Sequence, residues 1–140
     1  MRHITQEGLD LIKHFEGFSP IVYTCPAGYA TIGYGHLIKK DESFKTIKQE
    51  DAQVLLRSDA ETAERAVLRY IDVPLTDGQF DALVSFTFNL GSGALQRSTL
   101  RRKVNRQAHG EVPDQFNRWV WAGGRKLKGL IARRRMESSR

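Results

Sequence analysis

The feature that most constrains the fold is a run of residues, Phe80–Phe88, that is apolar on nearly every side of a helix. A capping box, Thr76-x-x-Gln79, precedes this run, and the segment Asn89–Gly93 that follows is rich in residues that end helices. A helix without a polar side must be covered all round, so we expect it at the centre of a helical core. A chain of 140 residues is long enough to bury one such core in a single domain.

Further helices are predicted on both sides of this central one. Thr46-x-x-Gln49 and Ser58-x-x-Glu61 are two more capping boxes, and apolar residues continue at helical spacing up to Pro74. The segment 58–71 is therefore predicted as a helix that could connect two lobes. Additional helices are expected near 98–106, 113–121 and 129–138, with the Gly123-Gly124 pair between the last two.

The first 36 residues predict one helix followed by a β-hairpin. Thr5 is placed to cap a helix that runs to about Glu16 or Gly17. Two short segments rich in Tyr, Thr, Ile and Val follow, and a type I turn expected at Cys25–Gly28 joins them. Because two strands alone are marginally stable, we expect a helix to pack on the hairpin.

Composition excludes several classes of protein. Hydrophobic residues make up 40% of the chain and charged residues 27%, as in an ordinary soluble globular protein. The first twenty residues contain no uninterrupted apolar segment, which predicts a chain without signal peptide or membrane anchor that stays in the cytosol. The single cysteine, Cys25, excludes an intramolecular disulfide. The four histidines lack the paired spacing of a zinc site, so no metal or other cofactor is expected.

Charge is distributed unevenly along the chain. Residues 1–95 contain 9 Lys and Arg against 13 Asp and Glu, whereas residues 96–140 contain 13 against 3. A basic surface attracts a polyanion, which could be nucleic acid, an anionic membrane or a cell-wall polymer. Charge alone does not choose among these, and a solvated surface that merely aids solubility explains the excess equally well.

Glu16, Cys25 and Thr31 are the candidate reactive residues. Glu16 shares one helix face with apolar Leu9 and Ile12, so its carboxyl is predicted to point toward the core, where partial burial favours its neutral form. Such a group can donate a proton to a glycosidic oxygen. From spacing alone the bland explanation is favoured, in which Glu16 pairs with an arginine, Cys25 fills the core and Thr31 is a strand residue.

A longer pattern changes that balance. The stretch Glu16-Gly17-x5-Tyr23-x-Cys25-x2-Gly28-Tyr29-x-Thr31-Ile32-Gly33-x-Gly35-His36 closely resembles the active-site region of phage-type lysozymes, the endolysins of glycoside hydrolase family 24. That family spaces its catalytic residues as Glu-x8-Asp or Cys-x5-Thr, and this chain matches the spacing without a gap. The resemblance continues in family order through the segments 79–91, 98–105 and 129–137 and through Trp119.

The resemblance implies an α+β fold of the lysozyme type, with a small β-hairpin lobe, a larger mainly helical lobe and the active-site cleft between them. One catalytic domain is expected over 1–140, with the small lobe at about 18–57, the connecting helix at about 58–71, and the helical lobe at about 72–140 plus the N-terminal helix. The implied activity is hydrolysis of the β-1,4 bonds between N-acetylmuramic acid and N-acetylglucosamine in peptidoglycan, which lyses the host cell.

Position by position, the resemblance makes Glu16 the general acid and Thr31 a residue that helps to hold the attacking water. Cys25 stands where many members have aspartate. A thiol with an ordinary pKa of about 8.5 is mostly neutral near pH 7, so it contributes less charge than a carboxylate. Whether Cys25 acts as base, nucleophile or spectator stays open, and with it the inverting or retaining outcome.

The resemblance also assigns residues around this centre. His36, which ends the hairpin lobe, and Asp59, at the start of the connecting helix, are expected to pair across the lobe boundary in a stabilising role. Arg133 or Arg134 is expected near Glu16 and to hold it in place. Substrate contacts are expected from three further residues, Tyr29, Asn89 and Asn105.

Other functions remain open from the residues. A cationic wall- or membrane-binding antibacterial protein with little catalysis would use the basic C-terminal region but would need neither Glu16 nor Thr31. A lytic transglycosylase would cut the same bond without water, and a nucleic-acid binder lacks a recognisable motif. The expected partners are peptidoglycan, an anionic wall or outer-membrane surface, and a holin that lets the monomeric enzyme pass from the host cytoplasm to the periplasm.

Overall fold

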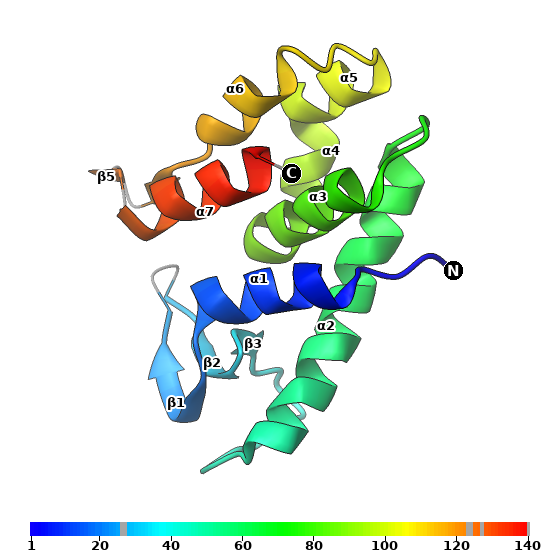
Figure 1. Ribbon diagram of the computed structural model, residues 1–140. Helices are drawn as coiled ribbons and strands as arrows, with labels where there is room; N and C mark the ends of the chain where they lie inside the picture. The colour runs from blue at the N-terminus through cyan, green and yellow to red at the C-terminus, as the bar shows by residue number, and fades with distance from the viewer. Residues whose placement is uncertain (26–27, 123–124, 127, 140) are drawn as a thin grey trace.

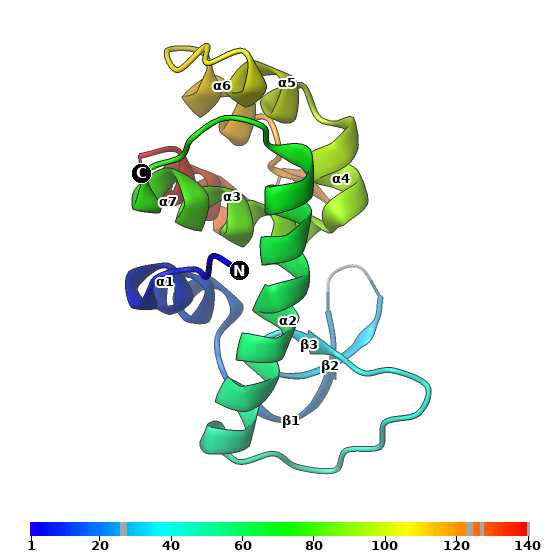
Figure 2. The same ribbon diagram turned by 90° about the vertical axis from the view of Figure 1, so that its right-hand side faces the viewer.

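The helix that is apolar on nearly every side lies at the centre of the structure, as the sequence predicts. The computed structural model describes residues 1–25, 28–122, 125–126 and 128–139. Helix α3 (Asp77–Leu90) begins after Thr76, whose hydroxyl accepts a hydrogen bond from Gln79 N while Thr76 N donates to the Gln79 side chain. Residues 80–87 are all buried, and Figures 1 and 2 show other helices on several sides of α3.

Six further helices surround α3 in the described part of the chain. They are α1 (Gln6–Glu16), α2 (Gln49–Tyr70), α4 (Ser92–Arg97), α5 (Thr99–Asn105), α6 (Val112–Asn117) and α7 (Lys128–Ser138). Figure 2 shows that α2 runs from beside the strands to the helices at the opposite end of the molecule. No helix among the described residues is both long and apolar enough to cross a membrane.

Helix α2 corrects the prediction of two separate starts. The capping boxes expected at Thr46 and Ser58 are both wrong, because α2 begins after Lys48 without a side-chain cap and continues through Ser58 for 22 residues. An unbroken stripe of buried small and apolar residues explains why the helix does not stop. This stripe consists of Ala52, Leu56, Ala60, Ala63 and Val67.

The predicted hairpin is present and carries a third strand. Strands β1 (Ser19–Thr24), β2 (Ala30–Gly33) and β3 (His36–Leu37) form an antiparallel sheet in the order β1-β2-β3. Strand β2 ends at Gly33 and the chain turns before β3, with Gly35 at a φ of 76°. Gly28 N donates to Cys25 O across the first turn at 2.8 Å, while the predicted type I conformation at 26–27 lies outside the described residues.

The C-terminal third is more finely divided than predicted. The helix expected near 98–106 begins at Thr99, because Ser98 ends α4 and its hydroxyl accepts a hydrogen bond from Arg101 N at the start of α5. The helix expected over 113–121 ends at Asn117, and strand β4 (Trp121–Ala122) pairs with β5 (Arg125–Lys126). The Gly123-Gly124 pair lies outside the described residues.

Two fully buried carboxylates fix the chain where it enters α1. Glu64 of α2 accepts a hydrogen bond from Ile4 N at 2.5 Å, and Asp81 of α3 accepts from Thr5 N at 2.9 Å and from the Thr5 hydroxyl. Thr5 also caps α1, as predicted, by accepting from Gly8 N. Because buried carboxylates need such donors, these contacts hold α1 in one position against α2 and α3.

Candidate active site

Glu16 is the last residue of α1, at the end nearest the sheet. Buried Leu9 and Ile12 lie on the same side of the helix, as predicted, and the Glu16 side chain keeps 19% of its surface exposed. Gly17, at a φ of 68°, ends the helix directly after it. The carboxyl is thus partly shielded from water and still reachable by a substrate, which is what a general acid requires.

The turn between β2 and β3 lies directly against this carboxyl. A Cβ atom added to Gly35 would lie 2.9 Å from both Cδ and Oε1 of Glu16, closer than such atoms approach. Gly35 also has a positive φ, which a side chain would strain. The sequence therefore needs glycine at this position to bring the sheet backbone against Glu16.

Strand β1 brings Tyr23 and Cys25 toward the same place. Both are partly buried, whereas Val22 and Thr24 between and beside them are exposed, as the alternation of a strand requires. Burial raises the pKa of the Tyr23 hydroxyl, and the nearby charges of Glu16 and of the Cys25 thiolate raise it further. Tyr23 therefore lies within electrostatic reach of both residues.

Tyr23 was missed as a candidate, although the sequence contained a signal for it. It stands in β1 two positions before Cys25, which directly follows the strand, so an extended chain directs both side chains to the same side. Tyr23 is also the antiparallel partner of Thr31 in β2. When one residue of a strand is a candidate for the site, the residues two positions away and the cross-strand partner are therefore candidates too, because they share its face of the sheet.

Thr31 is almost completely buried in β2. Its hydroxyl donates a hydrogen bond to the carbonyl of Tyr29 at 2.9 Å, which fixes the orientation of the hydroxyl. The oxygen keeps lone pairs that can accept a further hydrogen bond, for example from water. The side chain of Tyr29 itself is 62% exposed.

The two predicted arginines lie in α7 beneath Glu16. Arg133 Nη1 lies 3.2 Å from Glu16 Oε2, so the expected contact is present. Arg134 instead donates to Glu137, to the Asn89 side chain and, at 3.0 Å, to the Trp119 carbonyl. Arg133, Arg134 and Glu137 are all buried, so these two arginines are not part of a basic surface.

Asn105 does not belong to the group around Glu16. Its Oδ1 accepts a hydrogen bond from Asp72 N at 2.7 Å, and its Nδ2 donates to the Tyr70 carbonyl at 2.9 Å. Both polar atoms of the side chain thus bind the backbone at the C-terminal end of α2, which is a structural role. The substrate contact expected for Asn105 stays a prediction.

His36 pairs with Asp59, as expected, and with a second acid that was not expected. Its Nδ1 lies 2.7 Å from Asp59 Oδ2 in α2, and its Nε2 lies 3.0 Å from Glu42 Oε1. Burial opposes a charge on the ring, but the hydrogen bonds to Asp59 and Glu42 outweigh it and raise the pKa of His36. The charged ring therefore ties β3 to α2.

The contacts of His36 with Asp59 and Glu42, here called the His36 clamp, predict a pH-dependent contribution to stability. Because the folded pKa of His36 is raised, its contribution is full below the unfolded value of about 6.5 and is lost as pH rises through the folded value. We expect His36→Gln to lower the free energy of unfolding more at about pH 5.5 than at about pH 9. Denaturant titrations at the two pH values measure this difference, and an equal loss at both would contradict the clamp.

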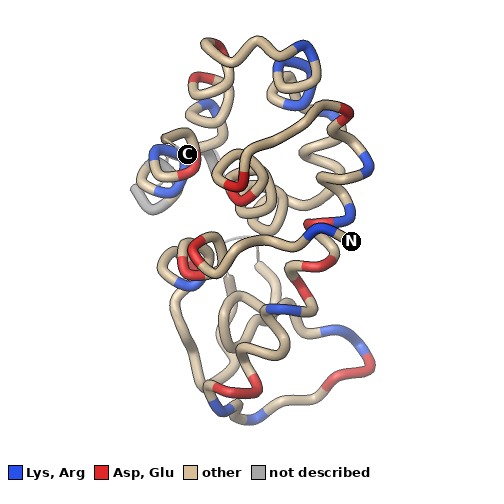
Figure 3. Tube along the Cα trace, turned by 45° about the vertical axis from the view of Figure 1, so that its right-hand side comes forward, with Lys and Arg blue, Asp and Glu red and all other residues tan. Residues whose placement is uncertain are grey.

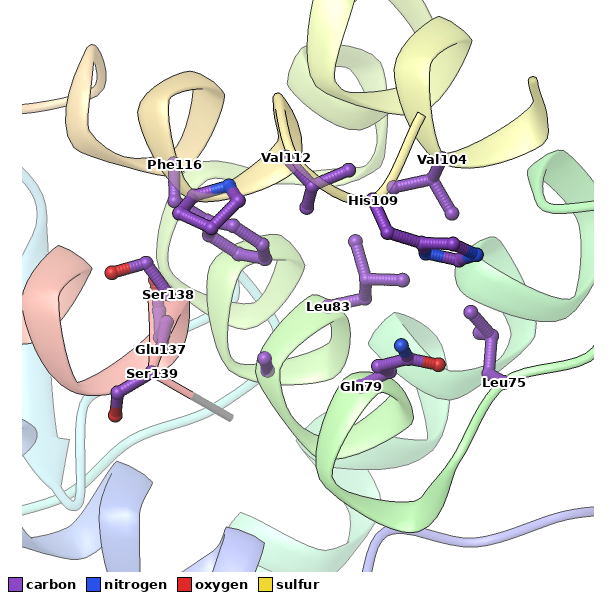
Figure 4. A pocket seen from close by; sticks show the side chains of 12 residues that line it. Leu75, Gln79, Leu83, Val104, His109, Val112, Phe116, Glu137, Ser138 and Ser139 are labelled. Atoms are coloured by element: carbon purple, nitrogen blue, oxygen red, sulfur yellow. The ribbon is translucent and has the colours of Figure 1, made fainter. Parts of the chain in front are cut away.

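The apolar cavity in the helical part of the molecule is separate from the Glu16 group. It has a volume of about 200 Å³ and lies among α3, α5, α6 and α7, with Leu83, Val112 and Phe116 in its walls. Figure 4 shows these side chains together with His109 and Gln79. Among the residues that the structure describes, Glu137 alone belongs both to the cavity wall and to the ion-pair network next to Glu16.

In the basic segment 96–140, some cationic side chains are already engaged in contacts within the protein. Arg101 donates to the carbonyls of Tyr70 and Gln96 and lies over the Tyr70 ring. Arg97, Arg102 and Arg106 are exposed, and Figure 3 shows basic positions gathered at and around α5. Among the described residues, no group of three or more His, Cys, Asp and Glu is arranged to hold a metal ion.

Comparison with known proteins identifies relatives over nearly the whole chain. The family model described as phage lysozyme matches residues 13–137. An endolysin of Acyrthosiphon pisum secondary endosymbiont phage 1 is 38% identical over 98% of this chain and 96% of its own length. An endolysin of Bacillus phage B103 is 39% identical over 96% of this chain, and the chain spans about half, 52%, of that relative.

A solved structure agrees with the sequence comparison. The muramidase domain of SpmX from Asticaccaulis excentricus superposes with a TM-score of 0.88 and 38% sequence identity, covering 99% of this chain and 97% of that one. The lysozyme-like α+β fold expected from the sequence is thereby confirmed.

Proposed function

The chain belongs to the phage lysozyme family, and on that basis we propose that it hydrolyses the β-1,4 bonds between N-acetylmuramic acid and N-acetylglucosamine in peptidoglycan. The observation that carries the proposal is the position of Glu16. Its carboxyl is partly buried, hydrogen-bonded to Arg133 and placed against the Gly35 backbone, and Tyr23, which is also within electrostatic reach of Cys25, lies within electrostatic reach of Glu16. A carboxyl that is partly shielded from water and still open to a substrate can donate a proton to a glycosidic oxygen.

In this mechanism Glu16 gives its proton to the glycosidic oxygen as the bond to the sugar breaks. The Thr31 oxygen accepts a hydrogen bond from the attacking water and so helps to align it. Tyr29, which is exposed beside Thr31, and Asn89 are proposed to contact the glycan. We further propose that the sheet side (about 18–57) and the helical side (about 72–140 with α1) act as two lobes joined by α2.

A lysis assay tests this function directly. Cells whose outer membrane has been removed should lose turbidity when the purified protein is added, with release of new reducing sugar ends. The same cells treated with the Glu16→Gln variant should stay turbid. Turbidity loss without new reducing ends would instead support a lytic transglycosylase if anhydro ends appear, and a cationic protein that damages membranes if the glycan stays uncut.

Cys25 provides a test of how the water is activated. If Cys25 takes part in the chemistry, Cys25→Ser should lower kcat more than Cys25→Asp does. Aspartate restores the residue that many family members have, whereas serine supplies neither a carboxylate nor a reactive thiol. Rates for both variants are compared on a soluble glycan fragment. Equal rates close to that of the unmodified protein would make Cys25 a spectator.

The exposed cations around α5 are proposed to attract the anionic wall. Exposed charges are screened over about 8 Å at physiological salt, so lysis of whole walls should fall as salt rises. Replacing Arg97, Arg102 and Arg106 with glutamine should flatten that salt dependence. Cleavage of short soluble fragments should change much less, because it needs no long-range attraction.

A second triple variant controls for the change in net charge. Lys40, Lys45 and Lys48 are exposed near the sheet, and replacing them with glutamine removes the same charge from elsewhere. If both triple variants keep the salt dependence of the unmodified protein, the basic surface is only solvated and has no binding role. We also propose that the protein is a monomer and that a holin lets it pass from the cytoplasm to the cell wall.

A further inference from the structure

Four charged side chains of alternating sign lie in contact beneath the site. Glu16 contacts Arg133, Arg133 contacts Glu137, and Glu137 contacts Arg134. Of these groups only Glu16 is reached by solvent to any extent, since the other three side chains are at most 3% exposed. Electrostatic interactions between such groups are screened little by water and salt.

Glu137 is completely occupied by its neighbours. Its Oε1 accepts from Arg134 Nη1, while its Oε2 accepts from Arg133 Nε at 3.3 Å and from the Ser85 hydroxyl at 2.5 Å. Arg133 is divided in turn, because its Nη1 binds Glu16 and its Nη2 donates to the Ser85 carbonyl at 3.0 Å. Glu16 and Glu137 thus share the charge of one arginine.

Because Glu137 shares the charge of Arg133 with Glu16, it also influences how readily Glu16 holds a proton. Among the described residues, the ionisable groups with a recorded interaction with Glu16 are Arg133 and Arg134 from α7 and Tyr23 from the sheet side, and Tyr23 in turn lies within electrostatic reach of Cys25. Two arginines beside a carboxyl favour its ionised form, which cannot act as a proton donor. The negative charge of Glu137 among those arginines offsets part of their effect.

We propose that Glu137 is a positioning residue that acts through Arg133: it fixes the guanidinium against Glu16 and balances the arginine charge, which would otherwise favour the ionised form of Glu16. This inference rests on the proposed function, in which Glu16 is the acid. Glu137 does not touch the substrate in this account. The i,i+4 and i,i+3 spacings of Arg133 and Arg134 to Glu137 place all three on one side of α7.

The pH dependence of kcat on a soluble glycan tests the role of Glu137. Glu137→Gln keeps the shape of the side chain and removes its charge, which leaves both arginines free to stabilise ionised Glu16. The basic limb of the profile should move to lower pH by about one unit, so activity falls about tenfold on that limb and little at acidic pH. Arg134→Gln removes a positive charge and should move the limb the opposite way.

Two controls separate this role from simple structural support. Glu111→Gln removes the same charge from an exposed acid and should leave the limb in place. The Cys25 thiol is followed by its own alkylation rate against pH, because its ordinary pKa of about 8.5 could also shape the basic side. Circular dichroism establishes that each variant is folded at the assay temperature.

The outcomes are distinct. An equal loss of activity at every pH for Glu137→Gln, or a limb that neither variant moves, overturns the tuning role while leaving Glu16 as the acid. If Glu137→Gln does not fold, the direction of the shift in Arg134→Gln decides alone. If Glu16→Gln stays active at every pH, the proposed function fails, and this inference fails with it.

Discussion

Replacing Glu16 with glutamine is expected to lower kcat by about 10²–10⁴-fold, the usual contribution of a general acid. Glutamine keeps the length and polarity of the side chain and can still accept a hydrogen bond from Arg133, so the surroundings should change little. What it lacks is a proton that can be transferred to the leaving oxygen. The loss should therefore appear in kcat on a soluble glycan, with KM nearly unchanged.

Asp10→Asn provides the matched control for this variant. Asp10 lies on the exposed side of the same helix and interacts there with Gln6. Losing its charge should leave kcat unchanged, which shows that charge loss on α1 is not itself the cause. A fall of less than about tenfold in folded Glu16→Gln protein would remove Glu16 from the mechanism.

Replacing Arg134 with methionine is expected to lower the free energy of unfolding by about 3–5 kcal/mol, as for other buried ion pairs that lose one partner. The guanidinium is fully buried over the Phe86 ring. Methionine fills part of the space but donates no hydrogen bonds, so Glu137, Asn89 and the Trp119 carbonyl lose a donor. Chemical denaturation followed by circular dichroism measures the loss.

Arg135→Met is the control on the same helix. Arg135 is the next residue and is exposed, so its replacement should change the free energy of unfolding by less than about 0.5 kcal/mol. Similar values for the two variants would mean that the buried network contributes little to stability. That result would also weaken the case that the network holds Glu16 in a fixed position.

Local sequence patterns predicted helices and strands correctly where tertiary packing favours the same structure. The Thr76 capping box, the largely apolar stretch of α3 and the hairpin before His36 all formed where the sequence indicated. The same kind of signal failed at Ser58, because a continuous buried stripe carries α2 past a possible start. A capping box shows where a helix could begin, whereas packing decides whether it does.

The site was predicted only in part because its support comes from distant segments. Glu16, Cys25 and Thr31 lie within one short stretch whose spacing can be compared with a family. The burial of Arg133, Arg134 and Glu137 depends on how α7 packs against α3, which charge patterns do not reveal. A cluster of cations by itself indicates an exposed surface. The signal against that interpretation is Glu137, an acid at helical spacing from Arg133 and Arg134.

The measurement that tests the central claim most directly is the chemistry of the cut ends. Purified peptidoglycan is digested with the protein in water enriched in heavy oxygen, and the fragments are analysed by mass spectrometry. A lysozyme that uses Glu16 as its acid should produce reducing N-acetylmuramic acid ends that carry the heavy oxygen, and Glu16→Gln should produce almost none. Anhydro ends without the label, or reducing N-acetylglucosamine ends, would contradict hydrolysis at the proposed bond.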